Sequence, residues 1–146
     1  LRTVVLDGVQ DPGNVGTIIR TAVAFGFDQV LLSPDCADVY NEKCVRSTQG
    51  ALFHIAISRT ELIPTLSELK EAGVTVIGTA LQGAQPLSEL PVSENIAVVL
   101  GNEGQGIRPA TLDICDQRAL IEMSSFESLN VAVAAGICLY RYRRRG

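Results

Sequence analysis

The residues best suited to chemistry lie in a glycine-rich loop, Gly101-Asn-Glu-Gly-Gln-Gly106, which directly follows the apolar run Val98–Leu100. Glycine has no Cβ and tolerates positive φ, so a buried strand that runs into such a loop brings its backbone close to a neighbour. Open α/β sheets bind their ligands at the carboxyl ends of strands. The loop therefore predicts a ligand site around one carboxylate, Glu103. The alternative is a tight strand-to-helix turn with a solvated Glu.

A second polar set lies near the amino end of the chain, in Asp11-Pro-Gly-Asn-Val-Gly-Thr-Ile-Ile-Arg20. Its first four residues have the composition of a turn, and an apolar pattern typical of a helix follows from about Val15 to Phe25. Asn14 is therefore expected at or just before the helix start, where its role could be limited to that of an N-cap. Arg20 lies within the predicted helix, where an exposed Arg is common.

The third set is Ile121-Glu-Met-Ser-Ser-Phe-Glu-Ser-Leu-Asn130, where a short strand ends in a polar loop before the last helix. Taken alone, Ser128 is most simply the cap of that helix. The helix, predicted from Ser128 to about Tyr142, has apolar residues around most of its circumference and small residues between them. A helix that is apolar on nearly all faces is buried on all faces. We infer from this pattern a homodimer interface on the last helix.

Strands and helices alternate along the chain, which predicts an α/β fold with a mostly parallel sheet flanked by helices. The predicted strands are Thr3–Leu6, Gln29–Leu32, Phe53–Ile57, Val74–Ile77, Ile96–Leu100 and Arg118–Ile121. The predicted helices are Val15–Phe25, Glu42–Thr48, Glu61–Ala72, Pro109–Ile114 and the last helix, with one further helical turn near Leu87–Leu90.

The composition fits one domain over residues 1–146, with 47% hydrophobic residues to fill a core. No apolar run reaches the roughly 18 residues of a membrane helix. The net charge of −4 argues against RNA binding by bulk electrostatics alone. We therefore expect a local patch of Arg46, Arg59, Arg108 and the C-terminal arginines, or an N-terminal RNA-binding domain that precedes this chain, which opens with Leu-Arg-Thr.

The four cysteines, at positions 36, 44, 115 and 138, include no Cys-x-x-Cys pair. Reduced, mostly buried thiols in a cytoplasmic protein are the expectation, with no metal site. His54 is the only histidine of the sequence, and it lies in the apolar run Leu52–Ile57, so we expect a strand residue rather than a catalyst. The chemistry must therefore use Arg, Glu, Asn, Ser or a cofactor.

Together, the three polar sets resemble the SpoU/TrmH class of the SPOUT superfamily, the RNA 2′-O-ribose methyltransferases. That class has an Asn-x-Gly-x-x-x-Arg run, a Gly-x-Glu-Gly loop after a strand, and a Ser-Leu-Asn-Val helix start. In this sequence the three are Asn14–Arg20, Gly101–Gly104 and Ser128–Val131. Each is weak evidence alone, but all three occur in the family's order and span nearly the whole chain.

The resemblance implies a SPOUT-type trefoil knot over about residues 98–146 and a homodimer packed through the knot region and the last helix. It also implies a ribosomal or transfer RNA partner and a cofactor, S-adenosylmethionine, held bent in the knot largely by backbone. The implied cofactor-binding residues are Thr79, Ala80, Leu81, Leu100, Gly101, Asn102, Gly104, Gly106, Ile121, Met123, Ser128, Leu129 and Asn130.

By the same resemblance, Arg20 is the leading catalytic residue and faces the cofactor of the other subunit. A guanidinium, with a pKa above about 12, is a poor base, so we expect Arg20 to hold an RNA phosphate and stabilise developing alkoxide charge. Asn14 would orient the ribose hydroxyl or Arg20. Glu103 would fix Arg20 or Asn14 through hydrogen bonds. Ser128 and Asn130 would complete the polar wall.

The sequence departs from the family pattern in two places. Ile121-Glu122-Met123 stands where the family usually has Ile-Pro-Met, and the loop from Met123 to Ser128 is one residue shorter than usual, with Ser125 near the customary glycine. Two alternatives to the enzyme remain. One is a binding-only relative that keeps the knot without activity, and the other is an unrelated α/β domain that binds nucleotides or anions and ignores S-adenosylmethionine.

Overall fold

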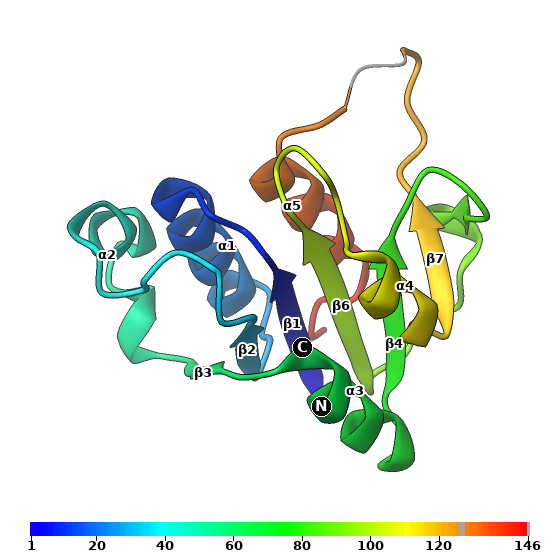
Figure 1. The fold of residues 1–146 in the computed structure, drawn as a ribbon, viewed down its shortest axis with the longest axis horizontal. Coiled ribbons are helices and arrows are strands. Elements are labelled where there is room, and N and C mark those ends of the chain that lie inside the picture. The colour runs from blue at the N-terminus through cyan, green and yellow to red at the C-terminus, as the bar shows by residue number, and fades with distance from the viewer. Residues whose placement is uncertain (126–127, 146) are drawn as a thin grey trace.

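A seven-stranded sheet forms the centre of the protein, in the order β3-β2-β1-β6-β4-β7-β5, and all of its strand pairs are parallel (Figure 1). The computed structural model describes residues 1–125 and 128–145. The strands are β1 (Arg2–Asp7), β2 (Gln29–Leu32), β3 (Ala56–Arg59), β4 (Thr75–Thr79), β5 (Gln85–Pro86), β6 (Ile96–Gly101) and β7 (Gln117–Leu120).

Helices join these parallel strands, which confirms the predicted α/β class. They are α1 (Pro12–Ala24), α2 (Glu42–Thr48), α3 (Leu62–Glu71), α4 (Pro109–Ile114) and α5 (Val131–Arg141), with short 3₁₀ turns at Ala51–Phe53 and Leu87–Glu89. None of the described helices is long and apolar enough to cross a membrane.

The central strands are buried on both faces, which accounts for their unbroken apolar runs. In β1, Val4 belongs to the core cluster formed with α1 and α5, whereas Val5 belongs to the cluster formed with α3. Val98 and Val99 of β6 divide in the same way. Helices cover both faces of the sheet, and the carboxyl ends of β1, β6, β4 and β7 lie along one edge (Figure 1).

Both site helices begin at a different residue from the one expected. Helix α1 is capped by Asp11, whose side chain accepts a hydrogen bond from the backbone N–H of Asn14 at 3.1 Å, so Asn14 lies inside the first turn. Helix α5 is capped by Asn130, which accepts from the backbone N–H groups of Ala132 and Val133 at 2.8 and 3.2 Å. The interpretation of Ser128 as the cap is therefore wrong.

The prediction for the edge strand β3 is also wrong. The strand predicted over Phe53–Ile57 lies later, as β3, and His54 is an exposed residue before it. In the single chain, helix α5 leaves part of its apolar surface uncovered, since Val133 is 51% exposed and Tyr140 is 53% exposed, and burial of this surface by a second subunit stays a prediction. Its buried face, which includes Cys138, packs on α1 and β6.

Candidate active site

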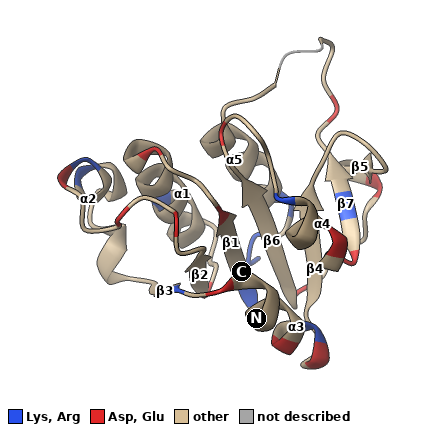
Figure 2. Ribbon diagram, in the orientation of Figure 1, with Lys and Arg blue, Asp and Glu red and all other residues tan. Residues whose placement is uncertain are grey.

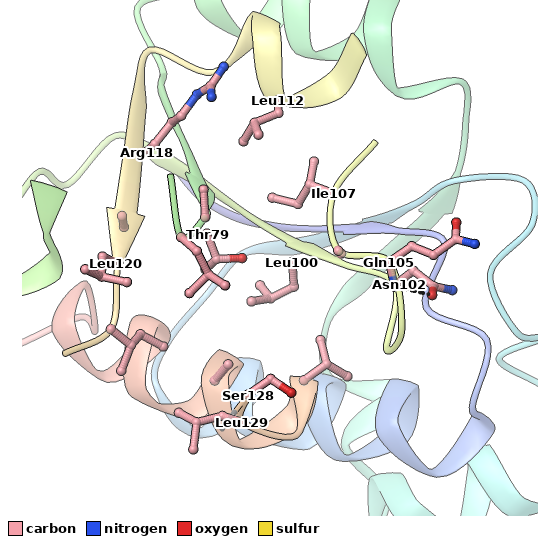
Figure 3. A pocket seen from close by; sticks show the side chains of 18 of the residues that line it. Thr79, Leu100, Asn102, Gln105, Ile107, Leu112, Arg118, Leu120, Ser128 and Leu129 are labelled. Atoms are coloured by element: carbon pink, nitrogen blue, oxygen red, sulfur yellow. Dashed lines mark hydrogen bonds between the residues drawn. The ribbon is translucent and has the colours of Figure 1, made fainter. Parts of the chain in front are cut away.

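A cleft of about 550 Å³ opens at the carboxyl ends of β4, β6 and β7, where the glycine-rich loop meets the segment from Ile121 to Leu129, and the Asp11–Arg20 set lies outside it. Figure 3 shows Ile107 and Leu112 on one side of the cleft, and Ser128 and Leu129 on the other. Leu100 lies between them. Every residue expected to bind a cofactor lines this cleft except Asn130, which lies in the adjoining pocket.

Sequence reasoning missed the other residues that line the cleft. They are Gln82, Gln105, Ile107, Leu112, Arg118, Ala119, Leu120, Val131 and Ala134, besides Glu103, which was expected as catalytic. Val131 is the last residue of the Ser-Leu-Asn-Val motif and Ala134 lies three residues later, so the first turn of the last helix was a usable signal. Leu112 and Arg118 come from α4 and β7, and only the pairing of β7 with β4 brings them to the cleft.

The glycine-rich loop after β6 is a tight hairpin. Asn102 and Gly106 exchange two backbone hydrogen bonds of 3.0 and 2.9 Å, and Gly106 has φ +75°. A Cβ added to Gly101 would overlap the backbone of Gly106 and Ile107, so this position accepts only glycine. The hairpin separates the cleft from the loop that follows β1 and presents Glu103 to that loop.

Glu103 joins the hairpin to the start of α1. Its two carboxylate oxygens accept hydrogen bonds from the backbone N–H groups of Gln10 (3.1 Å) and Asp11 (2.8 Å), and from the side-chain amide of Asn14 (3.3 Å). Partial burial alone would raise the pKa of Glu103, but the hydrogen bonds from Gln10, Asp11, its own backbone and the Asn14 amide together outweigh burial and lower that pKa. The carboxylate is therefore charged at neutral pH.

Asn14 also binds the residue that caps the last helix. The Nδ2 group of Asn130 donates a hydrogen bond to Oδ1 of Asn14 at 3.2 Å, while Oδ1 of Asn130 caps α5. Glu103, Asn14 and Asn130 thus form one chain of hydrogen bonds, and together with Gln10, Asp11, Ser128, Leu129 and Val131 they line a second pocket of about 640 Å³. We call this second pocket the rim pocket, because it borders the cleft along Glu103 and Ser128.

Arg20 does not join this cluster. Its side chain is exposed on α1 and makes no hydrogen bond or ion pair with any of residues 1–125 or 128–145. Of the two expected partners of Glu103, the structure shows Asn14, and a contact between Glu103 and Arg20 is absent from the described part of the chain. Arg20 remains a free guanidinium one to two helical turns beyond Asn14.

Comparison with known proteins places the chain in a family. The sequence profile of the SpoU rRNA Methylase family matches residues 2–140. The chain belongs to this family. It is 48% identical, over 97% of its length and 58% of the relative's, to the 23S rRNA (guanosine(2553)-2′-O)-methyltransferase RlmP of Bacillus subtilis.

Two solved structures of methyltransferases share the fold. An AdoMet-bound rRNA methyltransferase from Sinorhizobium meliloti superposes with a TM-score of 0.91 at 34% identity, over 96% of this chain and 54% of that one. The SpoU methyltransferase AviRb from Streptomyces viridochromogenes, in complex with the cofactor AdoMet, superposes with a TM-score of 0.88 at 32% identity. The match covers 95% of this chain and 58% of that one. The chain thus spans little more than half the length of these relatives.

One departure from the SpoU pattern makes a contact of its own. Glu122 accepts a hydrogen bond from the Ser88 hydroxyl at 2.7 Å, so it ties the segment after β7 to the 3₁₀ turn at Leu87–Glu89. The remainder of the shortened loop includes Phe126 and Glu127, which lie outside the described residues.

Lysines and arginines are dispersed over the fold (Figure 2), and six of the seven arginines expected to form a basic patch, all except Arg145, have a partner among the described residues. Arg46 pairs with Glu42 at 3.0 Å, and Arg144 pairs with Asp28 at 2.9 Å. The guanidinium of Arg59 donates to the backbone carbonyls of residues 33, 34, 36 and 37. Arg108 is held by two carboxylates. In the described part of this SpoU-family chain, each of these four side chains has a partner of its own, and RNA binding by them stays a prediction.

Proposed function

We propose that this chain catalyses S-adenosylmethionine-dependent methylation of a ribose 2′-hydroxyl in ribosomal RNA. The observation that carries the proposal is the adjacency of the apolar cleft and the rim pocket, which share Glu103, Ser128, Leu129 and Val131. Relatives that are named as 23S rRNA 2′-O-methyltransferases, and structural neighbours that are named as AdoMet complexes, support the same chemistry.

The cleft suits the cofactor in size and lining. Its volume of about 550 Å³ lies in the range of pockets for small organic ligands. Leu100, Ile121 and Leu129 provide apolar walls for a purine ring, and the backbone of the Gly101–Gly106 hairpin provides donors and acceptors at close range. When bound, the cofactor supplies a methyl group that the adjacent sulfonium already activates.

The chain's own residues then have to position a weak nucleophile. We place the acceptor ribose in the rim pocket, where the Asn14 amide is held by Glu103 on one side and Asn130 on the other. A carboxamide fixed from both sides presents a hydrogen-bonding group in one orientation, which lowers the entropic barrier to reaction. We assign no base to this position: the ribose hydroxyl would release its proton to solvent, and the methyl group would leave the sulfonium sulfur as it bonds to the ribose oxygen.

Arg20 is proposed to act on the cofactor site of a second subunit. It is exposed and unpaired within the described chain, so its charge is available to a phosphate or a developing alkoxide. Helix α5 exposes Val133, Ile137 and Tyr140, which are 51, 40 and 53% exposed, and a Cβ added at Gly136 meets nothing within 4 Å. Such an apolar face with room for close backbone approach supports a homodimer through α5.

A trefoil knot is proposed for the carboxyl half of the chain. Strand β7 lies near one edge of the sheet, yet the chain returns from it to place α5 against α1 and β6, near the middle. A return path of this kind supports the threading that the family resemblance implies. We also propose a cytoplasmic location, which the four free cysteines favour.

The experiment that tests the proposal is methyl transfer to RNA followed by analysis of the product. The protein is incubated with S-adenosylmethionine carrying a labelled methyl group and with 23S rRNA, and the RNA is digested to nucleosides for mass spectrometry. Label on a ribose 2′-oxygen is the expected result. Label on a base, or no transfer by a protein that binds the cofactor, contradicts the proposal.

A further inference from the structure

A smaller polar hollow lies beside the cleft, between the loop after β1 and the segment before α4. Its volume is about 380 Å³. We call it the side pocket. It is lined by Asp7, Gln10, Asp35, Asn102, Gln105 and Arg108, together with Gly106, Ile107 and Pro109. Figure 3 shows Asn102 and Gln105 at the end of the cleft remote from Leu120, which is the end that the side pocket adjoins.

The floor of the side pocket is a fixed ion cluster. Asp7, with a side chain 1% exposed, accepts from the backbone N–H and from Nη1 of Arg108, both at 2.9 Å. Nη2 of Arg108 donates to Asp35, whose other oxygen accepts from the Ser33 hydroxyl at 2.7 Å. The hydrogen bonds from Ser33 and Arg108 lower the pKa of Asp35, so it stays charged. Two carboxylates thus surround one guanidinium, which leaves an excess of negative charge.

The walls of the side pocket carry unused hydrogen-bonding groups. Gln10 and Gln105 are exposed, and their carboxamides make no hydrogen bond with any residue in the described ranges 1–125 and 128–145. Each carboxamide offers donors and an acceptor, which is how Gln recognises base edges. The negative floor repels a phosphate but attracts a neutral ring that carries N–H donors. A nucleobase fits these conditions.

The position of Gln10 relates this pocket to the reaction. Gln10 lines both the side pocket and the rim pocket, and its backbone N–H binds Glu103 at 3.1 Å. A ribose in the rim pocket would therefore carry its base toward the side pocket. We infer that the side pocket receives the base of the acceptor nucleotide and favours the amino-bearing bases guanine, adenine and cytosine over uracil. The inference rests on the proposed function, because that function places the ribose next to Gln10.

The test uses nucleotides as probes of the full 146-residue chain. The protein is saturated with S-adenosylhomocysteine and titrated separately with GMP, AMP, CMP and UMP, while the side-chain carboxamide signals are followed by two-dimensional ¹H–¹⁵N NMR. The signals of Gln10 and Gln105 are expected to shift, with tighter binding of the three amino-bearing nucleotides than of UMP. Gln105→Ala should weaken their binding about three- to tenfold, since it removes one or two hydrogen bonds.

Gln85→Ala is the matched control, because Gln85 is exposed on β5, outside all three pockets, and its substitution should leave nucleotide binding unchanged. Equal binding of the four nucleotides, or shifts that avoid Gln10 and Gln105, would overturn the inference. Saturation with S-adenosylhomocysteine is itself monitored at Leu100 and Leu129. If S-adenosylhomocysteine does not bind, the proposed function is contradicted. If it binds but the nucleotides do not, only the inference about the side pocket is contradicted.

Discussion

Glu103→Gln is the most informative single substitution, because it removes a charge and keeps the shape of the side chain. The carboxylate accepts from the N–H groups of Gln10, Asp11 and Asn14 at 3.1, 2.8 and 3.3 Å. A Gln amide keeps only one acceptor oxygen, so its NH₂ group must face at least one of these donors. The hydrogen-bond chain to Asn130 then loses its anchor.

The expected loss of stability depends on how exposed the Glu103 carboxylate is. Hydrogen bonds to charged groups contribute about 1.5–3 kcal/mol each, and solvent screening at this exposed carboxylate reduces that figure, so we expect a loss of about 1–2 kcal/mol in the free energy of unfolding. For a chain of this size, Tm falls by roughly 2–6 °C. Because Asn14 is no longer held, turnover should fall about 100-fold, the cost of a misplacement of roughly 1 Å.

The assay compares methyl transfer, S-adenosylhomocysteine binding and Tm for the wild type, Glu103→Gln and the control Glu71→Gln, an exposed position on α3. Since the pKa of Glu103 is lowered from 4.5, its contribution to stability is present above that value and is lost as the pH falls through the lower folded value. The Tm difference should therefore narrow in acid. If Glu103→Gln lowers Tm as expected but keeps the turnover of the wild type, the reasoning is refuted.

Three further substitutions test other parts of the site. Arg20→Ala should abolish methyl transfer yet leave S-adenosylhomocysteine binding, measured by calorimetry, within about twofold of wild type. Arg46→Ala is the control. Loss of both methyl transfer and S-adenosylhomocysteine binding in Arg20→Ala would show that Arg20 is structural. Gly101→Ala should lower cofactor affinity at least about tenfold and cost about 1–3 kcal/mol in denaturant unfolding, because its Cβ meets the backbone of Gly106; an unchanged affinity would count against the hairpin's role. Gly136→Leu should weaken self-association about tenfold or more in sedimentation, and an unaltered dimer would exclude α5 as the interface.

Much of the fold was predictable because the central strands are buried on both faces. The bounds predicted for β2, α2 and α4 match those of the structure, and β1 and β6 differ only by one or two terminal residues. The edge strand β3 was misplaced, since an exposed strand lacks the continuous apolar run that marked the others. The start of α1 carried a usable signal, an Asp followed by Pro at the first helical position, and the turn chemistry of the segment concealed it.

The site was predictable to the extent that it lies in contiguous motifs. The residues of the three loops reach the same edge of the sheet because all the strands that carry them run parallel. The contact of Glu103 with Asn14 was one of two expected options, and sequence alone had no means to choose between Asn14 and Arg20. Leu112 and Arg118 depend on the strand order, which local patterns do not encode. The side pocket depends on the Asp7–Arg108 ion pair, which spans 101 positions.

The most direct test of the central claim is a calorimetric titration of the protein with S-adenosylhomocysteine, the product of the proposed reaction. A dissociation constant in the micromolar range, near one site per chain, is the predicted result. Absence of binding to a folded protein would contradict the assignment of the cleft, and the departures at Glu122 and Ser125 would then be the first positions to restore to the family pattern.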